Sequence, residues 1–176
     1  MGVLYRVSAQ TAVNDERVAI IFGFITLALA LAVFTSCRTF VSLLMRAGIK
    51  KPADNKIYRT FNKYHMYYWW FFGVSVLAHV MMSTFHTGLP KAGDPDAGIH
   101  WTILILGLGG VISSGVLFST CRISQTLLAP AIPKLSLTNK AYASYFKYHA
   151  YYWWALALLV AAHFAAGYIH VGFWPG

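Results

Sequence analysis

Residues 63–70 read Lys-Tyr-His-Met-Tyr-Tyr-Trp-Trp, and residues 147–154 read Lys-Tyr-His-Ala-Tyr-Tyr-Trp-Trp. The two stretches lie 84 residues apart and differ at one position. The same offset aligns further glycines, leucines, lysines and histidines on both sides of each stretch without a gap. We therefore interpret the chain as a tandem duplication, with internal repeats at about residues 17–88 and 101–172.

Each repeat contains two long stretches without a charged residue. These stretches cover residues 18–36, 66–85, 101–120 and 150–169. About 20 apolar residues at a rise of about 1.5 Å each cross a ~30 Å hydrocarbon core, so each stretch predicts a transmembrane helix. An even number of crossings separates equivalent residues, so the two repeats run parallel. The predicted fold is an all-α membrane protein, a four-transmembrane-helix bundle of two tandem helical hairpins that forms a single domain over residues 1–176.

The composition argues against a water-soluble enzyme, and the distribution of charge indicates a membrane topology. Hydrophobic residues make up 58% of the chain and charged residues 11%, whereas soluble domains carry about 25% charged residues. Eleven of the fourteen Lys and Arg residues lie in the connections 37–64 and 121–148, beside a single acid, Asp54. An excess of Lys and Arg marks the cytoplasmic side. We expect both termini outside, the basic loops in the cytoplasm, and contact with anionic membrane lipid rather than nucleic acid.

Six of the seven histidines form three pairs related by the repeat. The pairs are His65 with His149, His79 with His163, and His86 with His170, while His100 has no counterpart. Along each helix the spacing is 14 and then 7 residues, which places the histidines on one face of a left-handed bundle. Histidines inside a membrane are costly and usually functional. The alternative is a neutral histidine that hydrogen-bonds across a helix interface.

The spacing of the two inner pairs limits the cofactors that they can hold. Fourteen residues separate the two levels by roughly 21 Å, so the pairs cannot share one metal ion. Each level offers two histidines from two helices. Two trans imidazoles suit a six-coordinate haem, whose macrocycle supplies the other four nitrogens.

The pattern His65-x13-His79 with His149-x13-His163, on two parallel helices, resembles the di-haem core of the transmembrane cytochrome b family. This is the b/b6 subunit of quinol-oxidising complexes, and the membrane domains of ferric reductases and NADPH oxidases use a similar pattern. The resemblance implies two haem b groups, one near the cytoplasmic side on His65 and His149 and one nearer the outer face on His79 and His163. Glycines on the other two helices would give the haems room, and the candidates are Gly23, Gly107, Gly109, Gly110 and Gly115.

The resemblance also implies roles for other residues. Haem propionates need cations near the membrane surface, and the repeat-matched candidates are Arg38, Arg122, Lys63 and Lys147. His86 and His170, with His100, lie near the outer face, where a quinone, a partner or a third haem are the open choices. Aromatic residues follow His65 and His149: Tyr67, Tyr68, Trp69 and Trp70, with their copies. We interpret them as interfacial belts, with stacking on a haem or quinone ring as the alternative.

The resulting hypothesis is an electron-transfer subunit that passes electrons across the bilayer through two bis-histidine haems. It would link a quinone pool to a redox partner and belong to a larger complex with other subunits. No residue is assigned a catalytic role, and whether that complex is an oxidoreductase stays open. Two alternatives remain: a non-redox transporter or channel for a metal or small solute, and a passive membrane anchor.

Overall fold

The computed structural model describes residues 2–88, 93, 95–121 and 140–172, and within these ranges the chain is helical without a strand. The elements are α1 (Gly2–Thr35), α2 (Arg38–Arg46), the short 3-10 helix η1 (Pro52–Asp54), α3 (Lys56–Lys63), α4 (His65–Thr87), α5 (Ala97–Ser119), α7 (Lys140–Lys147) and α8 (His149–Val171). The prediction of an all-α protein is confirmed for this part of the chain.

Three of these helices contain segments long and apolar enough to cross a membrane. The segments are Arg17–Thr35, Ala97–Ser119 and His149–His170. The chain thus has the helices of an integral membrane protein. α4 has 23 residues and three histidines, like α8, but it also contains serines and threonines, which α8 lacks and which lower its hydropathy. The fourth crossing, expected over residues 66–85, stays a prediction.

The two copies of the Lys-Tyr-His stretch have the same local structure. An eight-residue helix ends at Lys63 or Lys147, one tyrosine follows, and a 23-residue helix begins at the histidine. The tyrosines have nearly equal backbone angles, with φ of −92° for Tyr64 and −89° for Tyr148. Each long helix then ends at a glycine in the left-handed region, where a residue without a Cβ is favoured.

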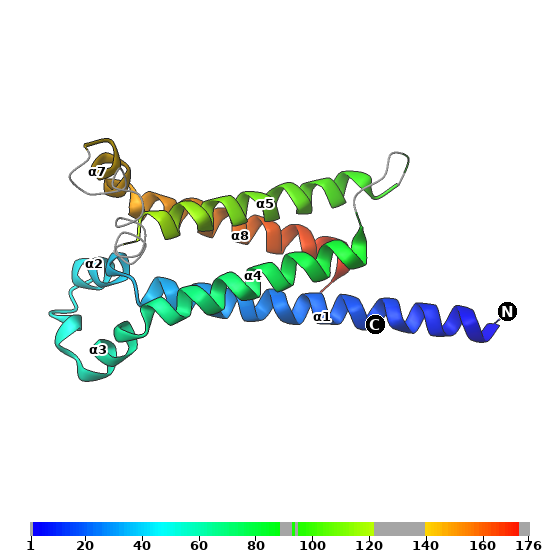
Figure 1. The fold of residues 1–176 in the computed structure, drawn as a ribbon, viewed down its shortest axis with the longest axis horizontal. Coiled ribbons are helices and arrows are strands. Elements are labelled where there is room, and N and C mark those ends of the chain that lie inside the picture. The colour runs from blue at the N-terminus through cyan, green and yellow to red at the C-terminus, as the bar shows by residue number, and fades with distance from the viewer. Residues whose placement is uncertain (1, 89–92, 94, 122–139, 173–176) are drawn as a thin grey trace, which may run out of the picture.

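The long helices pair within each half and meet between the halves. α4 lies beside α1, and α8 lies beside α5 (Figure 1). Phe34 and Trp153 connect the two pairs, with ring centroids 5.1 Å apart. α1 starts at Gly2, well before the predicted crossing at residue 18, because no glycine or proline interrupts residues 3–22. The first turns of α1 extend past the end of α4 (Figure 1).

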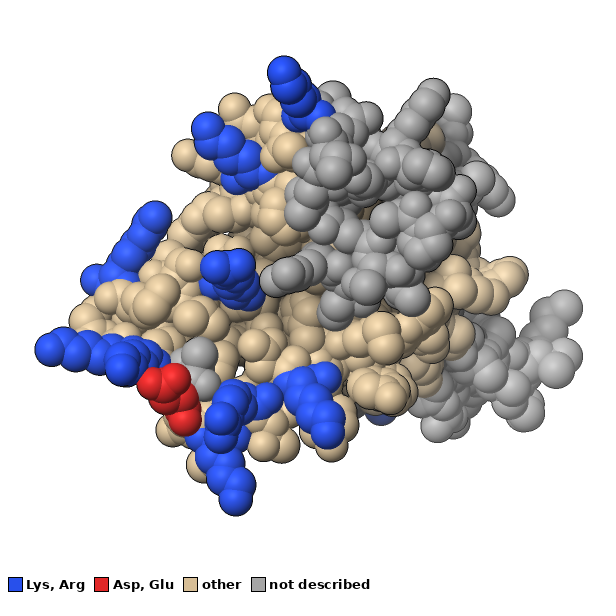
Figure 2. Space-filling model, turned by 60° about the vertical axis from the view of Figure 1, so that its left-hand side comes forward, with Lys and Arg blue, Asp and Glu red and all other residues tan. Residues whose placement is uncertain are grey.

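The short helices gather at one end, which we call the basic end. α2, α3 and α7 lie there, and Figure 2 shows Lys and Arg side chains (blue) spread over it, with acidic side-chain atoms (red) beside them. Asn55 caps α3 by accepting a hydrogen bond from the Ile57 amide at 2.8 Å. The Tyr58 hydroxyl donates to the Thr35 carbonyl at 2.9 Å and ties α3 to the end of α1. Burial, with a smaller contribution from Cys37, raises the pKa of Tyr58, which keeps this hydroxyl a donor.

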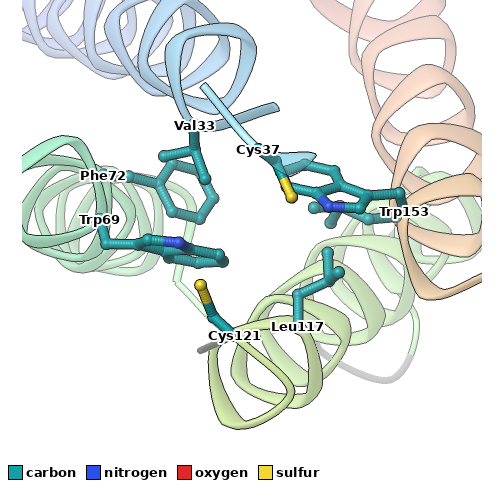
Figure 3. Close-up of a cluster of buried hydrophobic side chains, with 8 residues drawn as sticks. Val33, Cys37, Trp69, Phe72, Leu117, Cys121 and Trp153 are labelled. Carbon is teal, nitrogen blue, oxygen red and sulfur yellow. The ribbon is translucent and has the colours of Figure 1, made fainter. Parts of the chain in front are cut away.

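The buried core lies between the helix pairs, near the basic end. Val33 and Leu117 are fully buried, and two tryptophans point toward each other from α4 and α8 (Figure 3). The exposed fraction is 6% for Trp69 and 7% for Trp153, whereas it is 63% for each of their neighbours Trp70 and Trp154. The belt interpretation is therefore wrong for Trp69 and Trp153, which belong to the core.

Candidate functional site

The histidines that begin α4 and α8 each contact a hydroxyl at the end of the helix beside their own, α1 for α4 and α5 for α8. His65 Nδ1 lies 2.7 Å from Ser36 Oγ, and His149 Nδ1 lies 2.8 Å from Thr120 Oγ1. Ser36 and Thr120 are themselves 84 residues apart, so the two contacts are equivalent under the repeat. His65 and His149 thus have equivalent hydrogen-bond partners.

A tryptophan one turn further along each helix determines which ring nitrogen carries the proton. Trp69 Nε1 donates to His65 Nε2 at 3.2 Å, and Trp153 Nε1 donates to His149 Nε2 at 3.2 Å. An indole N–H is a donor only, so both Nε2 atoms accept and carry a lone pair. The protons therefore lie on Nδ1 and are donated to the hydroxyls.

The two hydroxyls in turn donate hydrogen bonds to backbone carbonyls. Ser36 Oγ donates to the carbonyl of Ala32 at 2.6 Å or of Val33 at 3.0 Å, and Thr120 makes the equivalent contacts on α5. Each chain runs from indole to imidazole to hydroxyl to carbonyl, with every donor matched to an acceptor. This order fixes the tautomer of His65 and His149.

Two buried thiols cross between the halves to reach the same nitrogens. Cys121 Sγ lies 3.3 Å from His65 Nε2, and Cys37 Sγ lies 3.3 Å from His149 Nε2. Figure 3 shows each sulfur beside one of the two core tryptophans. The thiols and indoles therefore occupy the positions next to the Nε2 lone pairs, where a metal bound by these histidines would coordinate.

The second level, further from the basic end, joins α4 and α8 directly. The imidazole rings of His79 and His163 have centroids 6.1 Å apart and planes at 84°. His79 Nδ1 lies 3.0 Å from the Ala19 carbonyl on α1, and His163 Nδ1 lies 3.0 Å from the Ile103 carbonyl on α5. A carbonyl only accepts, so both Nδ1 atoms carry the proton and both Nε2 atoms carry a lone pair.

The separation of these two rings suits a shared metal. Two metal–nitrogen bonds of about 2 Å, added to the half-widths of two imidazoles, place ring centroids about 6 Å apart. The donor set of each level, two neutral imidazoles with Nδ1 bound elsewhere, is the set that a bis-histidine haem requires. At the second level both the ring separation and the donor set are compatible with such a group. At the first level the donor set is compatible, and the indoles and thiols contact the Nε2 atoms.

Two glycines allow His79 and His163 to approach the neighbouring helices. A Cβ added to Gly23 would lie 3.3 Å from His79 Cε1, and one added to Gly107 would lie 3.1 Å from His163 Cε1. Each glycine follows by four residues the carbonyl that the histidine contacts, so its missing side chain opens the path to that carbonyl. Of the other predicted glycines, a Cβ at Gly109 would lie 3.3 Å from Leu159 Cδ2, while a Cβ at Gly110 or Gly115 would meet no described atom within 4 Å apart from the nearby backbone of its own helix.

The remaining predicted site residues divide between the two ends. Arg38, Lys63 and Lys147 are exposed at the basic end, and Arg122 lies outside the described residues. At the opposite end the structure brings His100 and His170 together, with their Nε2 atoms 2.8 Å apart. His86 lies in the last turn of α4, and its side chain is outside the described part of the structure.

The residues that support His65 and His149 were not predicted from the sequence. Ser36 and Thr120 are a repeat-matched pair of hydroxyl residues, so the alignment of the two halves contains a signal that could have found them. Trp69 and Trp153 each follow a histidine by four residues, which places both side chains on one helix face. The Ala19 and Ile103 carbonyls leave no signal in residue type.

A scan of protein-family models, a search of curated proteins and a search of solved structures each found no match to this chain.

Proposed function

We propose that this chain is a membrane-embedded b-type cytochrome that transfers electrons across the bilayer through two bis-histidine haems. His65 and His149 would ligate one haem, and His79 and His163 the other. The observation that carries the proposal is that all four imidazoles have Nδ1 bound to a hydroxyl or carbonyl, which leaves Nε2 unprotonated. When bound, the haems supply one-electron transfer.

The chain's own residues have three tasks in this function. The Ser36 and Thr120 hydroxyls and the backbone carbonyls orient the four rings and keep the proton on Nδ1. Gly23 and Gly107 leave room beside the second level. Arg38, Arg122, Lys63 and Lys147 supply cations for carboxylates at the basic end. Binding of a haem to His65 and His149 would displace the groups that contact their Nε2 atoms, which are the Trp69 and Trp153 indoles and the Cys37 and Cys121 thiols.

The proposed setting is a four-pass subunit of a larger redox complex that links a quinone pool to a partner. Support for the fourth crossing comes from α4, whose outward residues are apolar: Phe71, Val74 and Leu77 are exposed by 61%, 64% and 60%. Lipid would cover such a surface. The basic end would face the cytoplasm, because Lys and Arg concentrate there.

The test is a reduced-minus-oxidised absorbance spectrum of the full chain purified in detergent, with haem quantified as its pyridine haemochrome. We expect a b-type spectrum and about two haems per chain, one for each pair of histidines. A ratio of one haem per chain would refute the assignment of one of the two histidine pairs as haem ligands. A colourless chain that takes up no added haemin would refute the proposal.

Alanine at Gly107 should weaken the second haem selectively. Its Cβ would lie 3.1 Å from His163 Cε1, so the ring must shift from its carbonyl contact. We expect the haem on His79 and His163 to be lost or to change its midpoint potential, while the other haem is unaffected. Gly23→Ala, with 3.3 Å at the equivalent position, should show a smaller effect. The measurement is a potentiometric titration of each haem's absorbance.

Gly110→Ala, on the same helix, is the matched control, since its new Cβ would meet no described atom within 4 Å apart from the nearby helix backbone. It should keep both haems, and helix propensity should make it slightly more stable. Equal behaviour of Gly107→Ala and Gly110→Ala would contradict the assignment of the second level.

A passive anchor is the second candidate, favoured by the same hydrogen bonds. The contacts of His79 with the Ala19 carbonyl and of His163 with the Ile103 carbonyl tie α4 to α1 and α8 to α5. In an anchor these bonds would be the whole role of the histidines. Glutamine at His79 or His163 would then preserve function, whereas a haem protein would lose one haem.

A further inference from the structure

An open groove lies on the surface of the basic end, where α3 leads into α4. Its volume is about 460 Å³, within the range of ~300–1,000 Å³ that is typical of small-molecule sites. Tyr64 is the single residue between the two helices, and both helices line the groove. The lining residues are Lys56, Ile57, Thr60, Phe61, Tyr64 and Tyr68. None of them is a proposed haem ligand or propionate partner.

Apolar and aromatic side chains form most of this groove. Phe61 on α3 and Tyr68 on α4 pack against each other, with ring centroids 4.9 Å apart. Ile57 is 80% exposed, which is an unusual position for an isoleucine beside so many cations. Phe71, three residues after Tyr68 and on the same side of α4, is 61% exposed. The apolar surface therefore continues from the groove along the outside of α4, where it can accommodate an acyl chain.

The groove also presents hydrogen-bond donors to an anion. Lys56 has three N–H donors, and within the described part of the chain no carboxylate forms an ion pair with it. Tyr64 is 45% exposed, and none of the hydrogen bonds among the described residues uses its hydroxyl. The Thr60 hydroxyl donates to the Lys56 carbonyl at 3.0 Å. An ammonium and a phenol are thus the donors available to a ligand.

The charge around the groove selects an anionic ligand. Arg59 and Lys63 are exposed cations on α3, and Asp54 is the one acidic residue in the sequence between residues 46 and 63. Basic pockets at the cytoplasmic end of membrane helices bind the head groups of anionic lipids. An acidic protein would be attracted by the same cations, but it would leave the apolar surface along α4 unexplained.

We propose that this groove binds one anionic phospholipid. The lipid phosphate accepts hydrogen bonds from Lys56 and Tyr64. An acyl chain lies on Ile57, Phe61 and Tyr68 and follows the outside of α4. The inference rests on the membrane setting of the proposed function, since α4 must lie in the bilayer for a lipid to reach the groove, and it does not depend on the haems. In the second half Ala141 stands at the position equivalent to Ile57, so we expect one such site per chain.

The experiment is a titration of the full chain, purified and delipidated in detergent, with dioleoyl phosphatidylglycerol, followed by native mass spectrometry. We expect one lipid to remain bound per chain. The zwitterionic dioleoyl phosphatidylcholine should bind more weakly, because its choline cation would face Arg59 and Lys63. Lys56→Gln should weaken binding of phosphatidylglycerol by more than about tenfold, the effect of losing a hydrogen bond to a charged group.

Arg59→Gln is the matched control, because this exposed cation lies on the same helix but does not line the groove. It should weaken binding by no more than roughly fivefold, the effect of one cation near an anionic surface. Lys140→Gln, at the position equivalent to Lys56, should retain the lipid. Circular dichroism and gel filtration establish that each variant is folded.

Equal losses in Lys56→Gln and Arg59→Gln would overturn the site, because diffuse attraction would then explain the binding. Equal binding of the two lipids would overturn the role of charge. Displacement of phosphatidylglycerol by inorganic phosphate, or tighter binding of a poly-glutamate peptide, would overturn the choice of a lipid. The haem content of the same samples reports on the haem proposal separately.

Discussion

Alanine at His163 should remove one of the two haems and leave the other in place. The imidazole is one of two axial ligands in the proposal, and its ring lies 6.1 Å from that of His79. Without it, this haem would lose one of the two residues that would hold it, and it would bind more weakly than in the unaltered chain. We expect the haem-to-chain ratio to fall from about two to about one, as measured by pyridine haemochrome.

The repeat supplies the controls for this experiment. His79→Ala should give the same one-haem spectrum, because both histidines serve one level. His149→Ala should remove the other haem, so its residual spectrum should differ in band position or midpoint potential from that of His163→Ala. The double variant of His79 and His163 should resemble either single variant. Loss of both haems from one substitution, or of neither, would contradict the assignment of the ligands to two separate levels.

Replacing Thr120 with valine should weaken binding of the haem on His149 without changing a residue that would ligate it. The substitution keeps the shape of the side chain but removes the hydroxyl that accepts the Nδ1 proton at 2.8 Å. A buried donor left without an acceptor costs about 1–3 kcal/mol. The alternative is a proton move to Nε2, which blocks coordination. We expect about a 10–100-fold faster loss of this haem to an acceptor such as apomyoglobin, the size of effect seen for outer-shell partners.

The matched control is Thr120→Ser, which restores the residue type of the equivalent position, Ser36. It should retain its haem like the unaltered chain. Ser36→Ala should reproduce the effect of Thr120→Val on the same haem, acting through His65. If Thr120→Val and Thr120→Ser release haem at equal rates, the hydroxyl does not set the tautomer.

The sequence predicted the placement of the histidines better than their surroundings. The 84-residue offset and the 14-residue spacing put His79 and His163 at one level on α4 and α8, and the structure brings these rings together. The number of helices that cross the membrane, the haems and the topology stay predictions. The prediction worked where it rested on periodicity along single helices, which sequence spacing records directly.

The contacts between helices were beyond the same reasoning. The contacts of Cys37 with His149 and of Cys121 with His65 could not be predicted from the sequence, because they depend on how the two halves dock. Trp69 was assigned to a belt by its depth, although its place four residues after His65 already puts it on the inner face. Depth in the membrane and orientation around the helix are separate properties, and composition reports only the first.

The carbonyl contacts of His79 and His163 have a consequence for how this molecule can change over evolutionary time. No codon change at Ala19 or Ile103 deletes the acceptor, because every amino acid carries a backbone carbonyl. At Ser36 and Thr120 a single substitution removes it. The hydrogen-bond acceptors of His79 and His163 thus survive any substitution at their own positions, whereas those of His65 and His149 can be removed by one. If the proposed haems bind, substitutions of these hydrogen-bond acceptors should alter the haem near the basic end more readily than the one further away.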